Sequence, residues 1–80
     1  MTQGRMAMDD KRLRFAADVA EKAGVSRSLI LAVMWCIEDF YKRDKPIDYQ
    51  EIAVVIDADE VDVAAAIAAI RLVAKEWEIL

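Results

Sequence analysis

Residues that break helices are nearly absent from this chain, and this constrains its fold more than any other feature. Two glycines and one proline occur among 80 residues, and only Gly24 and Pro46 lie between stretches with a helical pattern. No segment shows the strict alternation of polar and apolar residues that indicates a half-buried strand. The sequence therefore predicts an all-α domain with short connections between its helices.

The ends of four helices can be located from capping signals. Gly24 is typical of the residue that follows a helix, Ser26 is a good N-cap, and Pro46 disfavours helix at the preceding residue. Two later sequences, IDYQEI and IDADEV, each have the pattern of a capping box flanked by a hydrophobic staple. We expect helices from Asp9 or Asp10 to Lys22 and over residues 26–42, 49–56 and 58–77.

Each capping box assigns roles to four residues. An aspartate caps the helix, a glutamate three positions later reaches back to it, and two apolar residues pack across the first turn. The residues concerned are Asp48, Glu51, Ile47 and Ile52 in the first box, and Asp57, Glu60, Ile56 and Val61 in the second.

The expected helix over residues 26–42 contains the run LILAVMWCI and is apolar on nearly every side. A helix of this kind is typically buried, so we expect Trp35 in the core. Trp77 stands near the end of an amphipathic stripe and is the better candidate for contact with a partner or with a second copy of the chain. Residues 1–8 lack periodicity and are expected to form a flexible terminus before a single helical domain over residues 9–80.

The composition argues against an enzyme and against a metal or cofactor site. The chain has no histidine, the commonest general base and metal ligand, and it has no glycine-rich phosphate loop. Cys36 is the only cysteine, which excludes a disulfide within the chain and a multi-cysteine metal site. We predict no catalytic residue, no cofactor and no bound metal.

Membrane insertion is not expected either. The longest apolar run, Leu29–Ile37, has nine residues, whereas a membrane-spanning helix needs about 20. The start, MTQGRMAMDD, lacks the apolar stretch and cleavage site of a signal peptide. We therefore expect a cytoplasmic protein.

The segment DVAEKAGVS, residues 18–26, resembles the first helix and turn of the DNA-binding head of the lac-repressor family. The resemblance implies that the next helix would enter the major groove. Beyond the turn the sequence departs from the family, because Leu31 and Trp35 are unsuited to a groove-reading face. The candidate DNA contacts are Arg12, Lys22, Arg27 and Ser28.

Residues 28–79 resemble winged-helix domains, notably the N-terminal domains of phage replication initiators and replisome organisers. Ala53 takes the small-residue position of a second helix-turn-helix pattern, and Asp57 takes its turn. No strand pattern for a wing follows the last expected helix. This resemblance implies that the helix over residues 26–42 is buried, and the apolar sequence of that helix favours the same placement. It also implies a four-helix, helix-turn-helix domain similar to a winged helix without the wing.

Charge is distributed unevenly along the chain. Residues 1–27 carry six basic and four acidic side chains, whereas residues 28–80 carry five basic and eleven acidic ones. Carboxylates repel the phosphates of DNA but suit a basic protein surface, and Asp59 and Asp62 exceed what helix capping requires. The candidate protein-interaction residues are Asp48, Glu51, Asp57, Asp59, Glu60, Asp62 and Trp77.

Two functions follow from these patterns. The first is a small protein of phage or mobile-element type that binds a basic, nucleic-acid-binding surface of a protein partner. It would inhibit or modulate a nucleic-acid-handling complex. It could act as a replisome accessory, or as an inhibitor similar to anti-CRISPR proteins, which resemble it in size and charge. The second is a DNA-binding transcriptional regulator that uses the helix with Arg27 and Ser28, with weak affinity because the chain is acidic. A homodimer is compatible with both.

Overall fold

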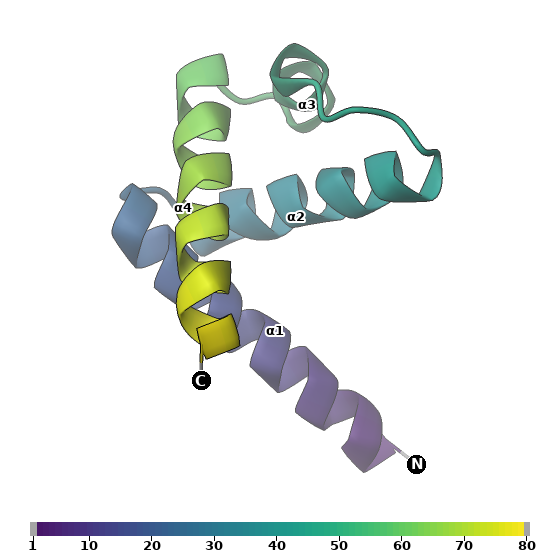
Figure 1. The fold of residues 1–80 in the computed structure, drawn as a ribbon, viewed down its shortest axis with the longest axis vertical. Coiled ribbons are helices and arrows are strands. Elements are labelled where there is room, and N and C mark those ends of the chain that lie inside the picture. The colour runs from purple at the N-terminus through teal and green to yellow at the C-terminus, as the bar shows by residue number, and fades with distance from the viewer. Residues whose placement is uncertain (1, 80) are drawn as a thin grey trace.

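The computed structural model describes the backbone of residues 2–79 and the side chains of residues 11–78. Within this range the chain is all helical and contains no strand, as the sequence predicts. Figure 1 shows α4 lying across α1 and α2, while α3 lies beside the first turns of α4, away from the N-terminal half of α1. The helices are α1 (Thr2–Ala23), α2 (Arg27–Lys42), α3 (Tyr49–Ile56) and α4 (Glu60–Ile79).

The backbone of α1 is helical from Thr2, earlier than the expected start at Asp9 or Asp10. We also expected residues 1–8 to be flexible. Met1 and the side chains of residues 2–8 lie outside the described part of the structure, so this flexibility stays a prediction.

Three helices end in the same way, on a residue with a left-handed backbone. The φ angles of Gly24, Asp44 and Asp57 are +73°, +57° and +56°. One residue further along, an amide N–H donates to the carbonyl five residues back, as in a Schellman motif. These bonds join Val25 N to Ala20 O (3.3 Å), Lys45 N to Phe40 O (2.9 Å) and Ala58 N to Ala53 O (2.9 Å).

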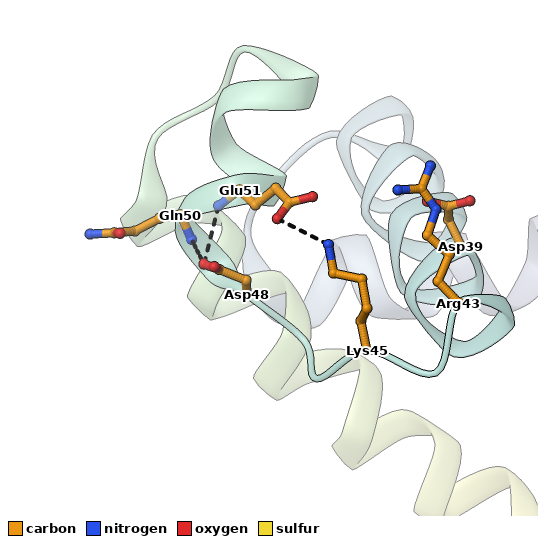
Figure 2. A network of polar contacts seen from close by, with 6 residues as sticks. All are labelled: Asp39, Arg43, Lys45, Asp48, Gln50 and Glu51. Atoms are coloured by element: carbon orange, nitrogen blue, oxygen red, sulfur yellow. Dashed lines mark hydrogen bonds and ion pairs between the residues drawn. The ribbon is translucent and has the colours of Figure 1, made fainter.

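Three N-caps were predicted from the sequence, and the starts of α2 and α3 agree with two of them. The hydroxyl of Ser26 accepts a hydrogen bond from Leu29 N (3.1 Å), and Asp48 Oδ1 accepts from Gln50 N (3.0 Å) and Glu51 N (3.2 Å) (Figure 2). The Glu51 carboxylate lies 3.7 Å from Lys45 Nζ and pairs with this ammonium group. The cap of α3 is therefore confirmed, with Glu51 in an ion pair to the preceding loop.

The prediction for the start of α4 is wrong. Asp57 has a left-handed backbone and ends α3, and the first backbone bond of α4 runs from Val63 N to Asp59 O (3.0 Å). The helix begins at Glu60, two residues later than expected, and Val61 is exposed, so it forms no staple. Asp57 favours the turn because a short polar side chain tolerates a left-handed backbone.

All four helices contribute to one core. The fully buried side chains include Val19 of α1, Ile30 of α2, Ile52 of α3 and Ile67 of α4. No buried side-chain nitrogen or oxygen atom among residues 11–78 lacks a hydrogen-bond partner. The small residues Ala16 and Ala20 of α1 and Ala66 and Ala69 of α4 are also buried, and small side chains let helices approach closely.

The prediction that the second helix is buried on every side is wrong. Only one face of α2 enters the core, through Ile30, Val33, Cys36 and Phe40. Trp35, expected in the core, is 60% exposed, and Tyr41 is exposed as well. The helix therefore has one buried face and one solvent-exposed face, and the exposed face also carries apolar residues.

The left-handed turns can be tested with a pair of substitutions of opposite sign. A Cβ atom added at Gly24 meets no atom within 4 Å, so Gly24→Ala is penalised by the backbone torsion alone. We expect a loss of about 1–2 kcal/mol in the free energy of unfolding, measured by urea denaturation followed by circular dichroism. Asp44→Gly, which relieves the same torsion after α2, should gain about 0.5–1 kcal/mol. Equal stability of Gly24→Ala and the parent chain would contradict this account.

Candidate functional site

The six predicted acidic residues fall into two groups rather than one. Asp48 and Glu51 lie at the start of α3, where Asp48 caps the helix and Glu51 pairs with Lys45 (Figure 2). The other four lie beyond the far end of α3. An eight-residue helix is about 12 Å long, so it separates the two groups. The second group is Asp57, Asp59, Glu60 and Asp62.

Exposed valines accompany the second acidic group. Val54 is 81% exposed and Val61 78% exposed, and Val55 is exposed beside Val54. All seven residues lie within the stretch 54–62, which folds around the left-handed turn at Asp57. We call these residues the α3–α4 corner; they are Val54, Val55, Asp57, Asp59, Glu60, Val61 and Asp62.

No basic side chain among residues 11–78 neutralises the carboxylates of the corner. Among residues 11–78, no ion pair reaches Asp57, Asp59, Glu60 or Asp62, and the ion pairs of α1, α2 and the following loop lie elsewhere. Glu60 and Asp62 stand in the first turn of α4, where the helix dipole favours negative charge. The corner therefore combines unneutralised negative charge with exposed apolar surface. Ion pairs between residues 11–78 include Arg12–Glu38, Lys22–Glu76, Arg43–Asp39 and Lys45–Glu51.

The sequence reasoning missed the valines of the corner. Val61 was assigned to a staple, and no role was predicted for Val54 or Val55. A signal was present in the length of α3: a helix of two turns can bury few side chains, and Ile52 is the one it buries fully. Its other apolar residues had to lie partly in solvent.

Two of the four candidate DNA contacts are engaged in ion pairs. Arg12 binds Glu38 of α2, and Lys22 Nζ lies 3.0 Å from Glu76 of α4. Arg27 and Ser28 remain exposed at the start of α2. The exposed Trp35 lies further along the same helix, so an apolar ring stands where a groove-reading helix would present polar groups.

Trp77 is held within the molecule by two contacts with α1. Its ring packs edge-to-face on Phe15, with centroids 5.3 Å apart and an interplanar angle of 89°. Its Nε1–H donates to Asp18 Oδ2 at 3.2 Å. The structure thus places this candidate interaction residue in the α1–α4 contact, half-buried. Its role toward a partner stays a prediction.

An open groove of about 440 Å³ lies beside this contact. Phe15 and Trp77 form part of its apolar lining with Met34 of α2, and Lys11 and Arg12 of α1 complete it. Because the groove is largely open to solvent and Arg12 is paired with Glu38, it offers little enclosed surface to a ligand.

Cys36 is buried in the core. Burial raises the pKa of its thiol, and the nearby carboxylates of Asp39 and Glu51 raise it further. A thiol of this kind is mostly protonated near neutral pH and reacts slowly, because the thiolate is the nucleophile. Residues 11–78 bring together no group of three side chains suited to hold a metal ion.

None of the helices in the described part of the chain is long and apolar enough to cross a membrane.

No protein-family model matches the chain, and neither a curated protein nor a solved structure is significantly similar to it.

The two tryptophans provide a test of these placements. Trp77→Ala removes the ring contact with Phe15 and the hydrogen bond to Asp18, so we expect a loss of about 2–3 kcal/mol in the free energy of unfolding. Trp35→Ala, a change of the same size at an exposed position, should cost less than about 0.5 kcal/mol. Urea denaturation followed by circular dichroism measures both values. The reverse order of the two losses would contradict the placement of both rings.

Proposed function

We propose that this chain is a protein-binding module that contacts a basic protein surface through the α3–α4 corner. The observation that carries the proposal is the presence of three exposed valines among four carboxylates that lack basic partners within residues 11–78. Acidic residues alone are common at helix starts, because caps and helix dipoles favour them. Helix capping and helix dipoles do not account for the exposed valines beside them.

The corner has the two components that protein interfaces use. Covering a valine side chain completely contributes about 1.5–3 kcal/mol, so Val54 and Val61 supply affinity once a partner excludes water from them. Carboxylates contribute mainly to the rate of association and to the choice of a basic partner. A partner that offers an apolar patch ringed by lysine and arginine side chains fits both components.

The same features disfavour DNA as the ligand of the corner. Phosphates would be repelled by four carboxylates, and a DNA backbone offers little apolar surface to the valines. The alternative, a transcriptional regulator that reads DNA through Arg27 and Ser28, is supported by their exposure. It is weakened because Arg12 and Lys22 are already paired with carboxylates.

The resemblances to helix-turn-helix proteins suggest the biological setting of the partner. In this proposal the helix-turn-helix geometry serves as a scaffold, and the partner is a basic surface of a nucleic-acid-handling complex. The chain would occupy that surface as an inhibitor or as a replisome accessory of phage or mobile-element type.

The proposal can be tested by titrating the isotope-labelled chain with two short peptides of equal positive charge and following its amide NMR signals. One peptide combines arginines with leucines, and the other contains only arginines among small polar residues. We expect the apolar basic peptide to bind more tightly and to shift the signals of Val54, Val55 and Asp59 most. Equal binding of the two peptides, or shifts confined to α1 and α2, would contradict the proposal.

Substitutions that preserve helix capping separate binding from folding. Asparagine caps a helix as well as aspartate does, so Asp59→Asn with Glu60→Gln should retain the fold while weakening peptide binding about tenfold. Glu21→Gln with Glu78→Gln changes the net charge equally at exposed positions outside the corner. This control should bind as the parent chain does.

A further inference from the structure

The outer face of α4 carries apolar side chains along most of its length. Val61 and Leu72 are exposed large apolar residues, and the exposed Ala65 and Ala68 lie between them. At 3.6 residues per turn these four positions fall on one stripe, opposite the buried Val63, Ile67 and Val73.

The stripe is symmetric about its own centre. Val61 and Leu72 lie equally far from the midpoint of the stripe, and Ala65 and Ala68 also lie equally far from it. If two copies of α4 run antiparallel with these midpoints together, each Val61 meets Leu72 of the other copy. The two small alanines meet at the centre, where small side chains allow a close approach of the helices.

Charged residues beside the stripe also complement one another in the antiparallel arrangement. Glu60 lies on the same flank of the stripe as Arg71 and Lys75, whose side chains are exposed and have no ion-pair partner among residues 11–78. Antiparallel pairing brings Glu60 of one copy beside Arg71 and Lys75 of the other, twice per pair. Two acidic residues, Asp62 and Glu76, lie on the opposite flank, and Glu76 is paired there with Lys22.

We propose that two copies of this chain associate through the outer face of α4, antiparallel about a two-fold axis. In such a pair the same patch serves both copies, because each contact of one residue with another is repeated in reverse. The contact is limited to one helix from each copy and is therefore small, and we expect reversible association in the micromolar range. The pair shares Val61 and Glu60 with the corner and leaves Val54, Val55, Asp57 and Asp59 open, so association through α4 would compete in part with partner binding at the corner.

Sedimentation equilibrium over a range of protein concentrations tests the association. The parent chain should change from monomer to dimer as concentration rises, and Leu72→Glu should weaken the dimer at least about tenfold. Leu13→Glu is the matched control, because Leu13 is 49% exposed and Leu72 51% exposed, on different helices. A parent chain that stays monomeric at millimolar concentration, or equal effects of the two variants, would overturn the proposal.

Charge reversal tests the antiparallel register. Glu60→Lys alone, and Arg71→Glu with Lys75→Glu, should each weaken the homodimer about tenfold. An equimolar mixture of the two variants should recover the association, since every reversed charge then faces its opposite. Failure of the mixture to recover would exclude this register. Circular dichroism verifies the fold of each variant. Leu72→Glu should bind the apolar basic peptide at least as tightly as the parent chain does, because weakening the dimer uncovers Val61 and Glu60. This separates the result from a failure of the proposed function.

Discussion

The fold depends on the packing of the last helix against the first. α4 and α1 make the most extensive contact between any two helices, and buried alanines on both sides allow their backbones to approach. Three polar or aromatic contacts flank this packing, from Phe15 and Asp18 to Trp77 and from Lys22 to Glu76. These contacts join the first and the last helix of the chain, and α2 packs against both of them. The outer face of α4 and the α3–α4 corner are what this packing leaves uncovered.

Local signals in the sequence predicted local structure well. The Ser26 and Asp48 caps, the left-handed turn at Gly24 and the bounds of α3 all depend on groups within a few residues of one another. The start of α4 was misplaced because three acidic residues stand close together, and aspartate suits both an N-cap and a left-handed turn. Nothing in the local pattern distinguishes Asp57, which ends α3, from Asp59, which precedes α4.

The surroundings of the two tryptophans could not be predicted for a different reason. Whether an apolar residue of a helix is covered depends on where distant helices pack, and the period of one helix carries no information on this. Trp35 lies in an apolar run yet faces solvent, whereas Trp77, near the end of the chain, is held by residues of α1. The same limit hid the valines of the corner, whose exposure follows from the way α3 packs through Ile52.

The central proposal is that this chain binds a protein partner through the α3–α4 corner and does not bind DNA. The most direct test is the fluorescence anisotropy of a labelled, mixed-sequence DNA duplex titrated with the protein from low to physiological salt. We predict no binding even at low salt, because Arg12 and Lys22 are paired and the corner is acidic. Micromolar binding that weakens steeply as salt is added would contradict the claim and would favour a regulator acting through Arg27 and Ser28.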